Sequence, residues 1–445
     1  MKPVISTIKD IYPSSQAEAQ KQRYKSAVTA FAEHFGSIGE HRFFSAPGRT
    51  EICGNHTDHN HGKVFAASVN LDVIAVVEPT EDDKIVIKSE GFPEDSVDLS
   101  QLAVVPEEKN TSASLIRGVA AGFEKEGMKI GGFRAYTTSD VMKGSGLSSS
   151  AAFEVLVGTI LSHLYNGGQV SAVKIAQISQ FAENVYFGKP SGLMDQMASS
   201  VGGFIAIDFK DTSSPIIESV PADFEKFGHA LCIVDAKGDH ADLTAEYAAI
   251  PQEMKAVAGY FTCDTLRQLS KDDIMLNIRV LREQFGDRAV LRSIHFFDEN
   301  ERVDKLVHAL KAGNFDDFLS SVKESGDSSY KYLQNIYAAS DIKHQCLSIA
   351  LNVAEYSLHR KGACRVHGGG FAGTIQAFVP LEMLQQFKMN IERTFGAGSC
   401  HVLSVRPIGG TEGRANYRAE REEEQGNAYQ TGGASSSFFT LTAYE

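Results

Sequence analysis

Short apolar runs follow one another along the first part of the chain and predict β-strands. They read "RFFSAP" (42–47), "KVFAASV" (63–69), "DVIAVVEP" (72–79) and "KIVIKSEG" (84–91). Beyond them, apolar residues recur at steps of three and four, which is the spacing of one helix face. This spacing predicts helices near 112–127, from Ser145 to Tyr165, and near 171–187.

The rest of the chain continues to mix the two periodicities. The pattern predicts strands at 202–209 and 229–237, mostly helix over 242–360, a strand at 373–380, a helix that ends near 395 and a strand at 401–407. Strands and helices that mix in this order are typical of an α+β fold. We expect a boundary between two domains somewhere in residues 210–228.

A chain of 445 residues is also longer than one domain usually needs. We therefore expect a leader at 1–24, an N-terminal domain at 25–215, a C-terminal domain at 216–408 and a tail at 409–445. The tail is charged and then rich in glycine and serine, a composition that predicts a mobile appendage.

Charge and cysteine content narrow the class of protein. The net charge of −13 and the lack of a clustered lysine and arginine run argue against a nucleic-acid partner. Six scattered cysteines without a CxxC pair suit a reducing compartment. The sequence has neither a signal-peptide core nor a run of eighteen apolar residues, so we expect a cytoplasmic protein with no membrane partner.

The stretch "KGSGLSSSAA" (143–152) is the first candidate for chemistry, because a Gly-Ser loop runs directly into a buried helix. Unpaired N–H groups and a partial positive charge at a helix start suit a phosphate. An ordinary serine-rich helix cap is the alternative from these residues alone. A P-loop is excluded, since the sequence lacks G-x-x-x-x-G-K-[ST].

Two further stretches contain glycine next to polar residues. "PSGLMDQM" (190–197) places Asp195 in an apolar setting, where a carboxylate needs a partner or acts as a helix cap. "RVHGGGFAG" (365–373) has a glycine density that suggests close backbone approach to a ligand. Its "HGGG" is also found in lipase oxyanion loops, but the sequence has no G-x-S-x-G nucleophile elbow.

The connection "GRTEICGNHTDHNHG" (48–62) collects an arginine, acids, histidines and asparagines between two predicted strands. So much convergent polar chemistry predicts a binding site. The residues alone leave a second interpretation open, a transition-metal site built from His56, Asp58, His59 and His61.

Together these motifs resemble a known family. "PGRTEICGNHTDHNHG", "GSGLSSSAAFEV", "GLMDQ" and "HGGGFAGT" are similar, in order and approximate spacing, to the signature motifs of the galactokinases. These enzymes are part of the family of galactokinase, homoserine, mevalonate and phosphomevalonate (GHMP) kinases. The resemblance covers roughly residues 25–408 and implies a two-domain α+β GHMP kinase fold with the active site in the cleft between the domains.

The resemblance also implies roles for individual residues. It makes Asp195 the catalytic carboxylate and Arg49 its basic partner, and it implies ATP and Mg²⁺ as cofactors. The implied nucleotide-binding residues are Ser89, Gly144, Ser145, Gly146, Leu147, Ser148, Ser149 and Ser150. The implied magnesium ligands are Ser150 and Glu183. The implied sugar-binding residues are Asn55, His56, Thr57, Asp58, Gly192 and Tyr247.

The chain departs from the family pattern at two positions. Met142 stands where the family usually has proline, and Asn55 stands where it has a glutamate that contacts the sugar near its sixth carbon. We expect ATP-dependent phosphorylation of galactose at the anomeric hydroxyl, in a pocket that Asn55 makes more permissive at that carbon. The alternatives are a kinase for L-arabinose or galacturonate, and a galactose and ATP sensor that no longer turns over.

Overall fold

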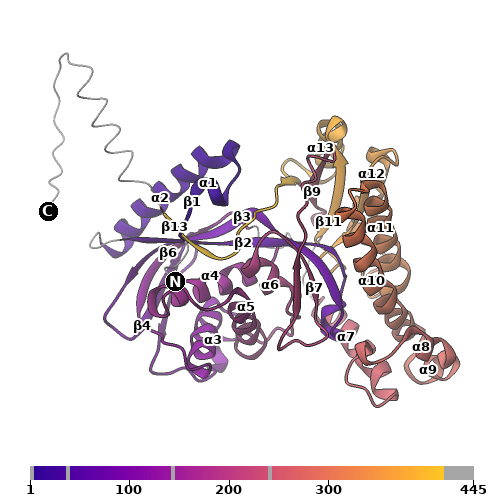
Figure 1. The fold of residues 1–445 in the computed structure, drawn as a ribbon, viewed down its shortest axis with the longest axis horizontal. Coiled ribbons are helices and arrows are strands. Elements are labelled where there is room, and N and C mark those ends of the chain that lie inside the picture. Colours follow the sequence, from indigo (N-terminus) through magenta and orange to yellow (C-terminus); the bar gives the residue numbers. More distant parts are fainter. Residues whose placement is uncertain (1–4, 37–40, 142–145, 239–242, 415–445) are drawn as a thin grey trace.

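The computed structural model describes residues 5–36, 41–141, 146–238 and 243–414. Its larger sheet has nine strands, of which seven follow the order β1-β13-β2-β3-β6-β4-β5, while β7 pairs with β3 and β8 pairs with β7 (Figure 1). These strands are β1 (Ile5–Thr7), β2 (Arg42–Cys53), β3 (Lys63–Pro79), β4 (Lys84–Ser89), β5 (Glu94–Asp98), β6 (Phe133–Ser139), β7 (Phe204–Asp208), β8 (Ile216–Ser219) and β13 (Thr411–Arg414). A smaller sheet has the order β10-β11-β9-β12, built from β10 (Ala363–His367), β11 (Thr374–Pro380), β9 (His229–Asp235) and β12 (Cys400–Leu403).

Helices cover both sheets. They are α1 (Ile8–Ile11), α2 (Ala17–Phe35), α3 (Ser112–Lys125), α4 (Ser149–Tyr165), α5 (Ala172–Phe181), α6 (Met194–Val201), α7 (Thr244–Tyr260), α8 (Lys271–Leu276), α9 (Ile278–Phe285), α10 (Asp287–Lys311), α11 (Phe315–Ser328), α12 (Cys346–Leu358) and α13 (Leu384–Phe395). Two π-helical turns, η4 (Ala182–Phe187) and η6 (Ser329–Leu333), continue α5 and α11. In Figure 1, α2 lies on one face of the larger sheet and α3 to α6 lie on the other.

The alternation of side chains along β3 explains these two layers. Ile74 and Val76 pack in a cluster with Tyr24 and Phe31 of α2. Their neighbours in the strand point to the opposite face, where Ala75 joins the main core with residues of α3 and α4. The main core also includes Ile233 of β9 and Phe378 of β11, so it continues from the larger sheet to the smaller one.

Residues 48–62 form the motif that resembles the sugar-binding signature of galactokinases, called the sugar-like motif below. Its first part is a strand, which corrects the expectation of a loop from Gly48 to Gly62. β2 continues through Cys53 and pairs with β3 as far as Cys53↔Phe65, with irregularities between Pro47 and Arg49 and between Glu51 and Cys53. The polar residues of this strand are buried rather than exposed, and such irregularities re-aim side chains near functional sites. The connection itself therefore contains only residues 54–62.

Both ends of the described chain belong to the fold, so two predicted boundaries are wrong. The proposed leader boundary after residue 24 falls inside α2, and Ile11 and Tyr12 are buried. The proposed tail contributes β13, which pairs with β1 and β2. The remainder of the tail, 415–445, lies outside the described residues, as do Met142, Gly144 and Ser145.

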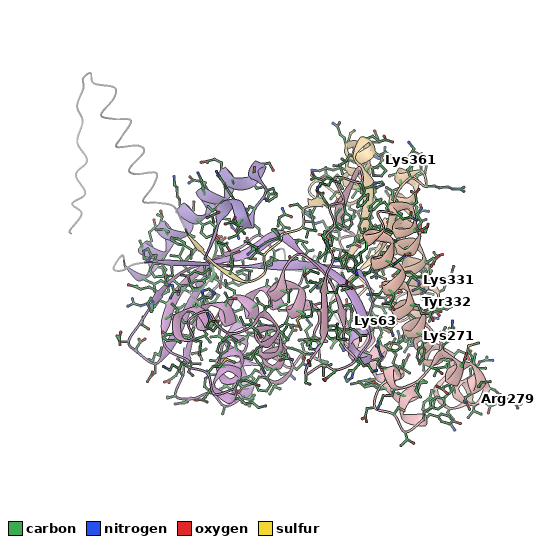
Figure 2. All side chains as sticks on the ribbon, in the orientation of Figure 1. Lys63, Lys271, Arg279, Lys331, Tyr332 and Lys361 are labelled. Atoms are coloured by element: carbon green, nitrogen blue, oxygen red, sulfur yellow. The ribbon has the colours of Figure 1, made fainter. Side chains whose placement is uncertain are left out.

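Surface cations of the helical region lie next to acids. Figure 2 labels several of them, and the pairs are Lys271–Asp298, Arg279–Glu283, Lys331–Asp327 and Lys361–Glu382.

All six cysteines are free thiols. Within the ranges given above, no helix is both long and apolar enough to span a membrane.

Candidate active site

Asp195 and Arg49 meet where α6 begins beside the middle of β2. Arg49 forms a two-pronged contact, with Nε 2.7 Å from Asp195 Oδ1 and Nη2 2.7 Å from Oδ2. The exposed fractions of the two side chains are 7% for Arg49 and 18% for Asp195. Burial opposes ionisation of Asp195, but the Arg49 guanidinium, with Lys189 and the Ser148 hydroxyl, holds its pKa well below the usual range. Asp195 is therefore a carboxylate at neutral pH.

The loop before α4, called the Ser-rich loop below, is described from Gly146 to Ser148, and these residues lie directly against the Arg49–Asp195 pair. The backbone N–H of Arg49 donates to the Leu147 carbonyl at 3.0 Å, and the guanidinium donates to the Gly146 carbonyl. Ser148 adopts a left-handed conformation (φ 58°) immediately before α4, so the loop turns sharply into the helix. The first turn of α4, with Ser149 and Ser150, thus begins close to Asp195, and the N-terminus of a helix suits an anion such as phosphate.

At Gly146 the Ser-rich loop lies against the Gly-rich motif, which is the stretch 365–373. It has a positive φ of 69°. A Cβ atom there would lie 2.6 Å from Thr374 Oγ1 and 2.9 Å from His367 Nδ1. Any larger residue would push the loop away from β10 and β11. The two predicted glycine motifs therefore lie in contact, although 221 positions separate Gly146 from His367 (367 − 146).

The predicted magnesium ligands are also brought together. The Ser150 hydroxyl donates to Glu183 Oε1 at 2.9 Å, and Glu183 is fully buried in η4. Lys189 Nζ lies 2.9 Å from the same oxygen. A hydroxyl and a carboxylate side by side form a hard-oxygen donor pair that suits Mg²⁺ when phosphate oxygens and water complete the shell.

Asp58 and Gly192 lie in contact between the sugar-like motif and the turn before α6. A Cβ atom at Gly192 would lie 1.8 Å from Asp58 Oδ2, so only glycine fits there. The backbone N–H of Met194, next to Asp195, points toward the same carboxylate oxygen at 3.5 Å. Asp58 is thereby held close to the start of α6, where Asp195 lies.

Side chains of the predicted sugar site also contact the Gly-rich loop. His56 Nε2 lies 2.9 Å from the Gly369 carbonyl, and the Tyr247 hydroxyl of α7 donates to the Gly370 carbonyl at 2.9 Å. Burial lowers the pKa of His56 to about 3, so the ring is neutral. A neutral ring that donates from Nε2 keeps Nδ1 as an acceptor.

Two of the predicted binding residues are buried, and a third forms a contact within the larger sheet. Thr57 is fully buried, and its hydroxyl donates to the Gly54 and Lys63 carbonyls, which closes the turn. Asn55 is fully buried as well. Ser89 ends β4 and accepts a hydrogen bond from Thr137 at 2.9 Å, a contact within the sheet.

The transition-metal interpretation receives no support from the geometry. The His56 and His59 rings are stacked with centroids 6.2 Å apart, rather than converging on one point. Within the part of the chain that the structure describes, no three His, Cys, Asp or Glu side chains gather as a metal-binding group.

Comparison with known proteins decides the family. The Galactokinase galactose-binding signature matches residues 29–79, and the GHMP kinases N terminal domain matches residues 114–203. A galactokinase of Glaesserella parasuis serovar 5 is 30% identical over 370 residues, which are 82% of this chain and 92% of the relative. The chain belongs to the galactokinase family.

Other galactokinases agree in sequence and in fold. The galactokinase of Thermotoga maritima is 31% identical over 332 residues, which are 74% of this chain and 87% of the relative. The crystal structure of Lactococcus lactis galactokinase complexed with galactose has a TM-score of 0.75 at 24% identity, and covers 88% of this chain and 100% of that one. The α+β GHMP fold expected from the motifs is therefore confirmed.

This galactokinase-family site contains three residues that motif reading missed. Lys189 contacts Glu183, and Gln196 Nε2 bridges the buried carboxyls of Glu183 (2.8 Å) and Glu154 (3.1 Å). Burial raises the pKa of Glu154 well above its usual range, which favours the neutral form of this carboxyl. In the sequence, Glu154 is notable only as the one charged residue of a helix that we expect to be buried. The sequence does not indicate which side chains contact it.

Proposed function

We propose that this chain transfers the γ-phosphoryl group of ATP to the anomeric hydroxyl of galactose, giving galactose 1-phosphate and ADP. The observation that carries the proposal is the Arg49–Asp195 pair, which lies between the sugar-like motif and the Ser-rich loop. The galactokinase relatives, one of them solved in complex with galactose, support galactose as the substrate.

In this proposal Asp195 orients the sugar and accepts the proton of the anomeric hydroxyl late in phosphoryl transfer. A carboxylate whose pKa is held low by Arg49 is a weak base toward a free hydroxyl. It accepts a hydrogen bond from the anomeric hydroxyl and takes the proton as the new O–P bond raises the acidity of that group. Phosphoryl transfer depends mainly on positioning and charge stabilisation, so a weak base is sufficient.

The nucleotide would lie on the Ser-rich loop and the first turn of α4. Arg49 then offsets charge on the transferring phosphoryl group while it holds Asp195 in place. Ser150 and Glu183 would hold Mg²⁺ together with phosphate oxygens, and the ion would neutralise phosphate charge when bound. Lys189, on the same Glu183 oxygen, keeps that buried carboxylate compensated in the metal-free chain.

The sugar would lie beside the turn that contains Asp58 and Gly192. Asp58 accepts hydrogen bonds from neighbouring ring hydroxyls, and His56 and Tyr247 complete the wall next to the Gly-rich loop. Two alternatives from the sequence analysis stay as outcomes of the test, because Asn55 stands where the resemblance implies a glutamate. They are L-arabinose and galacturonate, which differ from galactose at the sixth carbon.

A coupled ADP-release assay over galactose, L-arabinose and galacturonate tests the proposal. Galactose should support turnover, and ³¹P NMR of the product should show a phosphate on the anomeric carbon. Turnover with L-arabinose or galacturonate alone would transfer the assignment to that sugar. ATP and galactose binding without ADP release from any sugar would favour the non-catalytic sensor.

A further inference from the structure

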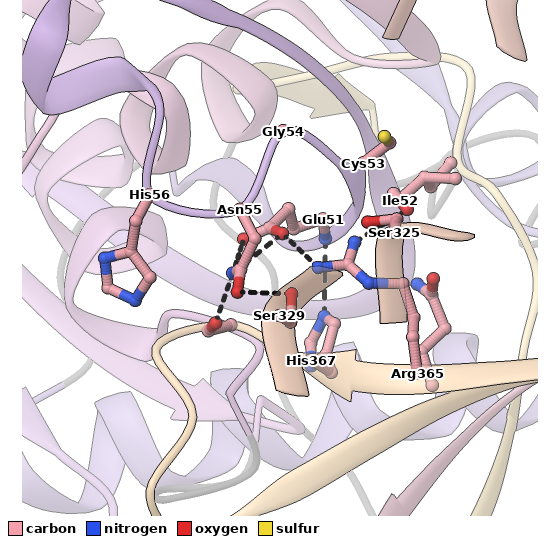
Figure 3. Close-up of polar contacts among 12 residues, drawn as sticks. Glu51, Ile52, Cys53, Gly54, Asn55, His56, Ser325, Ser329, Arg365 and His367 are labelled. Carbon is pink, nitrogen blue, oxygen red and sulfur yellow. Dashed lines mark hydrogen bonds and ion pairs between the residues drawn. The ribbon is translucent and has the colours of Figure 1, made fainter. Parts of the chain in front are cut away.

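Asn55 has no hydrogen-bonding capacity left for a sugar, and Figure 3 shows its contacts with Glu51 and Ser329. Its Nδ2 donates to Glu51 Oε1 at 3.0 Å and to the Gly368 carbonyl at 2.8 Å. Its Oδ1 accepts from Asn335 Nδ2 at 2.8 Å and from the Ser329 hydroxyl at 3.3 Å. A carboxamide offers two donors and two acceptor positions, and these four contacts use all of them. The residue is also fully buried.

The backbone around Asn55 is equally fixed by the second half of the chain. The N–H groups of Gly54 and Asn55 donate to Glu299 Oε1 at 3.0 and 3.3 Å. His295 Nε2 lies 2.9 Å from the Asn55 carbonyl. Side chain and main chain thus hold Asn55 in one orientation, and turning it toward a ligand would break several buried hydrogen bonds at once.

A buried ion pair explains why this position needs a neutral donor. Arg365 of β10 donates to Glu51 Oε1 at 2.9 Å and to the Ile52 carbonyl at 2.8 Å, and both charged side chains are buried. Asn55 Nδ2 lies 3.0 and 3.2 Å from the two Glu51 oxygens. An acidic side chain at position 55 would place a second carboxylate against Glu51 and would remove the donor to Gly368.

The Gly-rich loop is the segment that this network positions. Asn55 binds the Gly368 carbonyl, and Asn335 Nδ2 lies 3.1 Å from the Gly369 carbonyl. The same loop approaches the phosphate-binding region, since a Cβ atom at Gly368 would lie 3.6 Å from the Gly146 carbonyl. The amide of Asn55 therefore links the sugar-like motif to the loop that supports the Ser-rich segment.

We propose that Asn55 is a positioning residue that fixes the Gly-rich loop, and that it does not read the sixth carbon of the sugar. The proposal rests on the proposed kinase function. It replaces the expectation drawn from the sequence, in which Asn55 makes the pocket more permissive at the sixth carbon.

The test measures kcat and KM of the wild type and of Asn55→Glu with galactose, L-arabinose and galacturonate. We expect kcat to fall by about 10²-fold for every sugar that the wild type accepts, because the loop is displaced. The ratios of kcat/KM between sugars should stay within about threefold of the wild-type ratios. A residue that reads one hydroxyl group would shift these ratios by about 10- to 200-fold, and a shift of that size would overturn the proposal.

Asn335→Ala is the second variant, because Asn55→Glu places two carboxylates together and can prevent folding. It removes the donor to Asn55 Oδ1 and to Gly369 while leaving position 55 unchanged. The same fall in kcat with unchanged sugar ratios supports the proposal, and an unchanged kcat overturns it. If the wild type phosphorylates none of the three sugars, the proposed function fails, whereas altered ratios in an active enzyme refute only the role of Asn55.

Discussion

At the scale of single residues, the ionisation of Asp195 decides what this carboxylate can do. Its pKa lies well below the usual range despite burial, because Arg49, Lys189 and Ser148 stabilise the charge. A depressed pKa means that the charge, and the stability it contributes, is present above the ordinary value of about 3.9 and is lost only as the pH falls below it. Asp195 should therefore remain ionised throughout the neutral and mildly acidic range.

The ¹³C shift of the Asp195 carboxylate tests this state directly, without interference from nucleotide phosphates. In protein labelled at aspartate side chains, the signal that disappears in Asp195→Asn should keep one shift from about pH 8 down to about pH 5. A titration of that signal with a midpoint near pH 6 would instead make Asp195 a general base poised for proton removal.

Single residues also show how far motif reading reaches. Arg49, Asp195 and Ser150 could be proposed from the sequence because they lie in short motifs that resemble those of galactokinases, and the same resemblance implied Glu183. Lys189 could not, since its contact with Glu183 depends on the path of the chain from the end of η4 to α6. The saturation of Asn55 was equally hidden, because its partners come from η6, β10 and residues near them.

At the scale of elements, the π-helical turn η4 places Glu183, the carboxylate that we propose as a magnesium ligand. Periodicity predicted one helix over 171–187, but α5 ends at Phe181 and the wider turn Ala182–Phe187 follows. Such turns are rare and frequently occur at functional sites. Apolar spacing cannot distinguish an α-turn from a π-turn over six residues, so the sequence predicted the helix and not this change of pitch.

Glu183→Gln should raise the Mg²⁺ concentration needed for half-maximal rate by at least about tenfold, because the neutral amide is a weaker ligand. The KM for galactose should change much less. Glu154→Gln is the matched control, since burial favours the neutral form of Glu154 and glutamine keeps its size. A magnesium titration of Glu183→Gln that matches the control would remove Glu183 from the ligand set.

At the scale of the whole molecule, Asp72 of β3 binds residues near both ends of the described chain. Arg23 Nη1 of α2 lies 2.6 Å from Asp72 Oδ1, and Arg406 Nη1, near the end of the described chain, lies 2.9 Å from Oδ2. The Tyr12 and Ser45 hydroxyls donate to the same carboxylate. The buried Arg23–Asp72 pair shows why composition misplaced the leader boundary, since polar sequence near a terminus does not reveal a buried partner.

Asp72→Asn should lower the free energy of unfolding by about 3–5 kcal/mol, because it leaves two guanidinium groups near a buried site without their carboxylate. Burial raises the pKa of Asp72, but Arg23 and Arg406 lower it below the usual range, so the loss should be fully present at neutral pH. Chemical denaturation at pH 7 measures it. Glu283→Gln, at an exposed pair with Arg279, should change stability by less than about 0.5 kcal/mol.

The central claim is that the four motifs form one phosphoryl-transfer site around Asp195, and Asp195→Asn tests it most directly. The variant keeps the size of the side chain and some of its hydrogen bonding but removes the charge opposite Arg49. We predict that kcat with galactose falls by about 10²- to 10⁴-fold, while the Kd for ATP, measured by calorimetry, stays within about threefold. A variant that binds ATP normally and retains more than about a tenth of the wild-type kcat would contradict the claim.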